Sequence, residues 1–115
     1  NLLERISLHP VIEQDTIRGC VIYIDAFQNV ITNITKSLFT QVQQGRNFTL
    51  FFKRNESISQ LSWHYNEVLE GENLCLFGMS NHLEIAINKG NASGLLGLKL
   101  GDIVRIEFYT APAII

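Results

Sequence analysis

Three side chains with complementary binding chemistry stand at alternate positions between two apolar segments of the sequence: Asp25, Phe27 and Asn29. Side chains two residues apart in an extended chain point to the same side, so all three can face one side of a strand end or tight connection. The carboxylate attracts an amine or accepts from hydroxyls, the ring offers a stacking face, and the carboxamide both donates and accepts hydrogen bonds. The trio predicts a site for a flat ligand with polar edges.

The same trio also fits a purely structural interpretation. The segments on either side, residues 19–24 and 30–34, are rich in β-branched and aromatic residues and are predicted to be strands. In a hairpin between them, Asp25 and Asn29 would only satisfy backbone groups of the turn. The spacing alone is compatible with both interpretations.

Further short strands and two brief helices are predicted around this segment. Alternation and short apolar runs predict strands over residues 16–24, 29–34, 47–53, 58–65, 74–77, 83–88 and 103–109. Thr35 and Asn91 are the predicted N-caps of helical segments that end near residues 44 and 97. About seven short strands at this spacing are typical of a sandwich or small barrel, because a parallel βαβ fold would need more and longer helices.

Several single side chains receive structural predictions. Trp63 is predicted to lie in the core. Glu84 is predicted to lie on a solvated strand face, with burial at a subunit interface as the alternative. Asn88 and Asn91 are predicted to serve turn and cap roles.

Composition narrows the function classes. The 115 residues suffice for one domain, and with 46% apolar and 17% charged residues no segment is long and apolar enough to suggest a membrane role. The net charge of −2, without a concentrated basic face, argues against nucleic-acid binding. Cys20 and Cys75 are predicted to be buried in a reducing compartment, which favours a cytoplasmic protein, and no zinc-type spacing predicts a metal site.

The start of the chain bears on its domain organisation. It begins with Asn1 rather than Met, which suggests a processed chain or a piece of a longer protein. Residues 1–15 are predicted to be a linker or edge segment, and residues 16–115 to be the domain itself. The apolar tail over residues 110–115 is expected to pack against the core.

Three stretches in this order resemble one family: YIDAFQNVITNI over residues 23–34, SNHLEIAINKGNA over residues 80–92, and LGLKLGDIV over residues 96–104. They look like the C-terminal domain of the S-adenosylmethionine hydroxide adenosyltransferases, a family that includes the fluorinating and chlorinating enzymes. The resemblance implies a small antiparallel β-barrel of about seven short strands with two short helices. It also implies a two-domain enzyme whose N-terminal domain carries the catalytic residues, so that none lies in this chain.

The chemistry that the resemblance implies is displacement at the ribose carbon that bears the sulfonium. An activated water, or a halide in the halogenating relatives, attacks S-adenosylmethionine and releases methionine. The water-using members form adenosine and need no cofactor. In the family's homotrimers the C-terminal domain faces the N-terminal domain of a neighbouring subunit, and the two share the site.

The resemblance assigns binding roles to five residues. Asp25 matches the acid that binds the methionine ammonium, and Ser80 matches the serine at the methionine carboxylate or amine. Phe27 and Tyr65 match two rings that sandwich adenine, and Asn29 matches the carboxamide at the hydrogen-bonding edge of the base.

Three positions depart from the halogenating relatives. Asn81 stands where those enzymes have an arginine on the substrate carboxylate, which predicts weaker holding by Asn81 or another group in its place. Ile87 replaces a second arginine, which favours hydrolysis over halogenation. Gln28 replaces the usual glycine, so the loop is expected to do without a positive φ. The alternative function is a free-standing β-barrel module for binding or oligomerisation, without catalysis.

Overall fold

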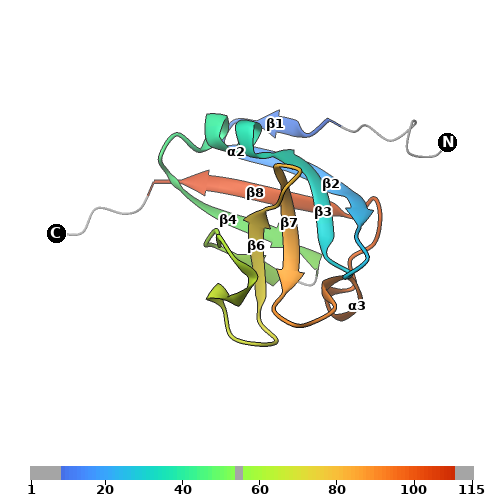
Figure 1. The fold of residues 1–115 in the computed structure, drawn as a ribbon. Coiled ribbons are helices and arrows are strands. Elements are labelled where there is room, and N and C mark those ends of the chain that lie inside the picture. The colour runs from blue at the N-terminus through green and yellow to red at the C-terminus, as the bar shows by residue number, and fades with distance from the viewer. Residues whose placement is uncertain (1–8, 54–55, 111–115) are drawn as a thin grey trace.

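The described chain forms one antiparallel sheet that curls into a nearly closed barrel (Figure 1). The structure is a computed structural model and describes residues 9–53 and 56–110. Seven strands follow one another around the barrel in the order β5 (Glu56–Ile58), β4 (Asn47–Phe52), β8 (Ile103–Tyr109), β2 (Thr16–Ile24), β3 (Val30–Thr35), β7 (His82–Ile87) and β6 (Asn73–Phe77). The small antiparallel β-barrel predicted from the sequence is confirmed.

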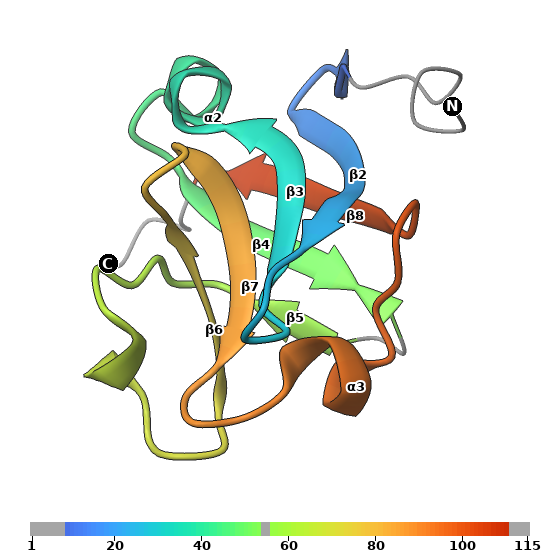
Figure 2. The ribbon, with the colours of Figure 1, turned by 45° about the vertical axis from the view of Figure 1, so that its right-hand side comes forward.

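The long strand β2 pairs with a different strand along each half of its length. Its first half, from Thr16 to Cys20, pairs with β8, and its second half, from Val21 onward, pairs with β3 across a register shift. Such an irregularity bends a strand and raises its twist, which closed sheets require. Figure 2 shows the result, with β3, β7 and β6 side by side on one flank of the barrel.

The gap between β5 and β6 is bridged by the segment that follows β5. The backbone N–H of Ser62 donates to the carbonyl of Cys75 at 2.9 Å, and Leu61 forms an isolated parallel bridge to Cys75. This contact satisfies part of the exposed edge of β6 and brings residues 61–67 against the outer flank of the barrel.

The interior is filled by the inward side chains of all the longer strands. Ile17, Leu50, Ile85 and Ile106 have no solvent exposure. Phe39 closes one end from helix α2 (Lys36–Gln43), with its ring 5.1–5.3 Å from the rings of three other phenylalanines in edge contacts: Phe48, Phe77 and Phe108. Burial of one such side chain stabilises the fold by about 1.5–3 kcal/mol.

Both predicted helices form with the predicted caps. Thr35 Oγ1 accepts from the N–H of Leu38 at 3.2 Å at the start of α2. Asn91 Oδ1 accepts from the N–H of Gly94 at 2.7 Å at the start of α3 (Ala92–Leu96), which ends at Gly97 with φ +68°. Asn88 lies in the turn after β7, as predicted, but its side chain bonds outside the turn, with Nδ2 donating to the carbonyl of Val68 at 2.9 Å.

The strand predicted over residues 58–65 is wrong. The strand β5 ends at Ile58, and the chain then runs irregularly into a single turn of 3₁₀ helix, η2 (Tyr65–Glu67). The carboxylate of Glu67 accepts from the backbone N–H groups of Trp63 and His64, and this local bonding replaces a strand ladder. Trp63, predicted to lie in the core, is 78% exposed.

The strands β6 and β7 are buried on both faces. Beyond the barrel interior, Leu74, Leu76 and Ala86 form a second buried cluster with Val68 on the outer face. Glu84 lies on this face and is only 8% exposed, so its predicted solvated position is wrong, and the burial arises within this chain itself. Alternation along a strand does not reveal that a distant segment covers its outer face.

The chain termini are described only in part. Strand β1 (Val11–Glu13) pairs with the start of β2, so part of the predicted linker is an edge strand. Residues 1–8 and the predicted packing of residues 111–115 lie outside the described residues. No helix in the described ranges is long and apolar enough to cross a membrane.

The two cysteines are buried and unbridged, as predicted. Burial raises the pKa of the Cys75 thiol to about 12 and also raises the pKa of Cys20. Both thiols are therefore protonated near neutral pH and suited to packing rather than to chemistry.

Candidate ligand-binding site

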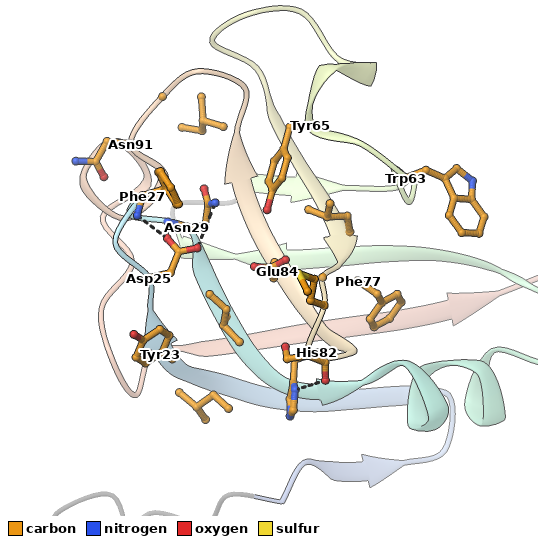
Figure 3. Close-up of a pocket in the computed structure, with 18 of the residues that line it drawn as sticks. Tyr23, Asp25, Phe27, Asn29, Trp63, Tyr65, Phe77, His82, Glu84 and Asn91 are labelled. Atoms are coloured by element: carbon orange, nitrogen blue, oxygen red, sulfur yellow. Dashed lines mark hydrogen bonds between the residues drawn. The ribbon is translucent and has the colours of Figure 1, made fainter.

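An open cavity of about 1430 Å³ lies over the outer face of the strands β3, β7 and β6 (Figure 3). Its floor follows from strand register, because Ile31 pairs with Glu84 and Glu84 pairs with Leu76, so the three side chains lie in a row on one face. The β2–β3 loop, the segment around η2 and the β6–β7 turn supply the walls. The candidate residues that line it are Asp25, Phe27, Asn29, Tyr65 and Ser80.

The β2–β3 loop is built around the carboxylate of Asp25. Asp25 Oδ1 accepts from the backbone N–H groups of Phe27 and Asn29, each at 2.9 Å. Asp25 Oδ2 lies 3.4 Å from Nδ2 of Asn29. The turn role expected in the hairpin interpretation is therefore present. It leaves Asp25 and Asn29 on the cavity wall and leaves Phe27 79% exposed, so one loop geometry accommodates both interpretations.

Gln28 adopts a φ of +66°, so the expectation that this loop would do without a positive φ is wrong. Two backbone hydrogen bonds hold the residue there. Its N–H donates to the carbonyl of Asp25 at 2.9 Å, and its carbonyl accepts from the N–H of Ser93 at 3.0 Å. The second bond ties the loop to α3, and together they offset the cost of about 1–2 kcal/mol that a non-glycine residue bears in this conformation.

Tyr65 stands on the wall formed by η2. Figure 3 shows its hydroxyl directed toward the carboxylate of Glu84. Partial burial, followed by the negative charges of Glu84 and Asp25, raises the pKa of Tyr65. The three groups are thus close enough to interact electrostatically, and Tyr65 keeps its proton at neutral pH.

The β6–β7 turn separates the last two candidates. Ser80 lines the cavity, and its carbonyl lies 3.0 Å from Nδ1 of His82. Asn81 instead lines an adjacent hollow of about 280 Å³, together with Lys36 and Trp63. It has a φ of +61° and donates its N–H to the carbonyl of Gly78 at 2.9 Å. The structure brings five of the six candidates together and sets Asn81 apart.

Glu84 is a cavity residue that sequence reasoning did not select. It comes from the middle of β7, lines the floor and is nine-tenths buried. Burial, and secondarily the charge of Asp25, raises the pKa of its carboxyl. The available signal was the position of an acidic residue inside the apolar run 83–87, where a strand covered on both faces would bury it.

Large apolar side chains surround the cavity mouth. Phe27, Trp63 and Met79 all line the cavity and are 78% exposed or more. Exposed apolar side chains gathered around a cleft are typical of surfaces that meet a ligand or another protein. Within residues 9–53 and 56–110, no group of three His, Cys, Asp or Glu side chains could hold a metal ion.

Two solved structures resemble this fold. A structure titled as an uncharacterized conserved protein from Thermotoga maritima has a TM-score of 0.71 and 31% identity, over 85% of this chain and 38% of that one. A conserved hypothetical protein from Thermus thermophilus shares the fold with a TM-score of 0.58 and 24% identity, over 80% of this chain and 34% of that one. The chain thus spans little more than a third of either protein.

The family assignment rests on a match over most of the chain. Residues 19–105 match the family described as the SAM hydroxide adenosyltransferase C-terminal domain, where SAM is S-adenosylmethionine. The match covers the β2–β3 loop, η2 and the β6–β7 turn that wall the cavity. This chain therefore belongs to the family of SAM hydroxide adenosyltransferase C-terminal domains.

Proposed function

We propose that this chain is the substrate-binding domain of an enzyme that cleaves S-adenosylmethionine with water to adenosine and methionine. The observation that carries the proposal is the convergence on one cavity of five residues from three separate segments of the sequence: Asp25, Phe27, Asn29, Tyr65 and Ser80. They are the residues to which the family resemblance gives binding roles. The chain alone is inactive, because the nucleophile is activated by residues of an N-terminal domain.

The adenine ring lies between Phe27 and Tyr65. Each stacked face contributes about 1–3 kcal/mol, by comparison with bases stacked on aromatic side chains. Asn29 lines the cavity, and its long contact of 3.4 Å with Asp25 leaves the carboxamide able to bond the edge of the base. Its two donors and its acceptor then read a ring nitrogen and an amine together.

The methionine half of the substrate lies between the β2–β3 loop, which carries Asp25, and the β6–β7 turn, which carries Ser80. Asp25 accepts from the ammonium group, for which Oδ2 is the better placed oxygen because Oδ1 already accepts two backbone N–H groups. Ser80 donates to the carboxylate. A charge-assisted hydrogen bond of the Asp25 kind is about twice as strong as a neutral one.

The reaction needs a positioned and desolvated nucleophile in line with the sulfonium leaving group. This domain fixes the substrate, and the exposed apolar side chains at the mouth exclude water once a second protein surface covers them. That surface is the N-terminal domain of a neighbouring subunit in a homotrimer. A strictly monomeric full-length protein would contradict this arrangement.

Water rather than halide is the nucleophile. Ile87 lines the cavity as a nearly buried apolar residue, where the halogenating relatives have an arginine. The adenine end of the site therefore lacks, at this position, the cationic group that accompanies halide chemistry in the resemblance.

Product analysis of the full-length protein tests the proposal. The protein is incubated with S-adenosylmethionine in chloride buffer, and adenosine and chlorinated adenosine are separated by chromatography. Adenosine is expected to form and chlorinated adenosine is not. Asp25→Ala abolishes the activity, whereas Glu13→Ala, on the exposed strand β1, leaves it unchanged.

A second variant separates ligand binding from loop folding. Asp25→Asn keeps an oxygen for the backbone N–H groups of Phe27 and Asn29 but removes the charge, so it too lowers turnover. Neither binding nor turnover by the wild-type protein would refute the proposal. Saturable binding of another ligand, unaffected by Asp25→Ala or Asn29→Ala, would favour a free-standing binding or oligomerisation module.

A further inference from the structure

Glu84, a residue that is nine-tenths buried, presents its carboxylate to the open cavity, where no residue in the described ranges pairs with it. It lines the cavity floor, and it makes no hydrogen bond or ion pair with any residue in the described ranges. Burying an ionised carboxylate that nothing neutralises costs free energy, and folded proteins pair nearly all such groups. Glu84 is held against an open cavity and has no partner in the described ranges, so its carboxylate is available to a ligand.

A glycine makes room for this carboxylate. A Cβ atom at Gly78 would overlap Glu84 Oε2 and would lie 2.7 Å from its carboxyl carbon. Gly78 does not have a positive φ, so its backbone conformation does not require glycine. Space for Glu84 is the physical reason for glycine here, and positions on the two sides of the β6–β7 turn therefore fit together to hold one carboxylate in the cavity.

The protein supplies no positive charge to Glu84 from the residues that the structure describes. Lys89 lines the cavity, but its Nζ lies 3.9 Å from Glu70 Oε2 and its side chain is 73% exposed. His82 directs Nδ1 to the carbonyl of Ser80. Asp25 is the charged neighbour that acts on Glu84, and it adds a second negative charge. A ligand that neutralises the charge of both carboxylates carries positive charge of its own.

The place of Glu84 along β7 indicates which part of the ligand it meets. The turn with Ser80 precedes the first end of β7, and Ile87 forms its last end. Figure 3 shows His82 on one side of Glu84 and Phe27 and Asn29 on the other. Glu84 lies between these ends. On the proposed function, Asp25 meets the ammonium group and Phe27 meets the adenine, and the sulfur that joins the two halves lies over the cavity floor, which Glu84 lines.

We infer that Glu84 recognises the sulfonium centre of the ligand, so that Asp25 and Glu84 together select a molecule with two separate positive charges. The inference rests on the proposed function and adds a specificity-determining residue to it. A neutral thioether, which is identical elsewhere, lacks the second charge and leaves Glu84 unpaired. The site therefore discriminates between S-adenosylmethionine and S-adenosylhomocysteine by charge at one atom.

Calorimetric titration of the full-length protein with two ligands tests this inference. One is an S-adenosylmethionine analogue that carries a protonated amine in place of the sulfonium, and the other is S-adenosylhomocysteine. Glu84→Gln is expected to weaken binding of the cationic analogue about tenfold or more and binding of the thioether less than about twofold. Asp25→Asn weakens both ligands alike, because both keep the ammonium group.

Two further variants complete the design. Gly78→Ala displaces the carboxylate without removing its charge and is expected to reduce discrimination in the same direction as Glu84→Gln. Glu13→Gln, on β1, changes neither affinity. Equal loss of both ligands in Glu84→Gln, as recognition of ribose hydroxyls would give, overturns the inference, and so does no loss. Absence of binding of either ligand by the wild-type protein refutes the proposed function itself.

Discussion

The two faces of β7 are both buried, but the inner face contributes to stability and the outer face to ligand binding. Inward, Leu83 and Ile85 have no exposure and pack in the barrel core. Outward, Glu84 is almost as well buried, yet it faces a cavity and lacks a partner in the described chain. Burial of apolar side chains on the inner face stabilises the fold. Burial of the Glu84 carboxyl on the outer face costs free energy, which a bound ligand can offset. Substitutions in the core should therefore lower stability more than binding, and substitutions at the cavity should lower binding more than stability.

The largest effect on stability is expected in the core on which the inner face of β7 packs, where Phe39 enters from α2. Phe39→Ala removes a ring that meets three others and should lower the free energy of unfolding by about 3–5 kcal/mol. Urea denaturation measures the change. Leu95→Ala, at a residue that is 69% exposed, is the control and should stay within about 0.5 kcal/mol of the wild type. A loss below about 1 kcal/mol for Phe39→Ala would contradict the packing described.

At the cavity mouth, a large effect on binding and a small effect on stability are expected. Phe27→Ala should weaken binding of the cationic analogue by about 1–3 kcal/mol, through loss of a stacking face. The free energy of unfolding should change by less than about 0.5 kcal/mol, because the ring is 79% exposed. Titration calorimetry and urea denaturation of the same preparations give both numbers. Unchanged affinity would remove Phe27 from the site.

The pH dependence of stability sharpens the comparison at Glu84. Folding raises the pKa of this carboxyl, so the ligand-free folded state holds its proton more tightly than the unfolded state does. Above the unfolded pKa, the wild-type protein should therefore lose stability relative to Glu84→Gln as the pH rises, up to the folded pKa. Thermal unfolding of both proteins between about pH 4 and pH 8 measures the difference. The other ionisable side chains of the cavity that the comparison involves are present in both proteins: Asp25, Tyr65, His82 and Lys89. A glutamine variant that is less stable than the wild type at neutral pH would show that Glu84 is paired in the fold.

The smallest effect is expected in the loop. Gln28→Gly should raise the free energy of unfolding by about 1 kcal/mol or less, because glycine adopts the φ of +66° without strain but loses more backbone entropy on folding. Gln28→Ala keeps the strain and is the matched control, with little change expected. A destabilising glycine variant would indicate that the Gln28 side chain makes contacts that offset the strain.

The sequence predicted the barrel well because its signals are local. The strand over residues 16–24 and the caps at Thr35 and Asn91 agree with the structure, since β-branched runs and capping side chains act within a few residues. The strand predicted over residues 58–65 failed, because Glu67 bonds the backbone of Trp63 and His64 from the following turn.

The site was only partly predictable, for a different reason. The spacing of Asp25, Phe27 and Asn29 marks a local group, but the sequence pattern alone does not bring Tyr65 and Ser80 to the same cavity; the family resemblance did so, and the fold agrees. Val68 packs on Leu74, Leu76 and Ala86, and so covers part of the outer face on which Glu84 also lies, a face that alternation alone leaves open. Long-range covering of this kind leaves no periodic signal in the covered strand.

A crystal structure of the full-length protein with the cationic analogue would test the central claim most directly. We expect the ligand in the cavity over β3, β7 and β6, with its base between Phe27 and Tyr65, its ammonium at Asp25 and its second charge at Glu84. A ligand bound elsewhere, or in this cavity with Asp25 and Glu84 both out of contact, would contradict the account.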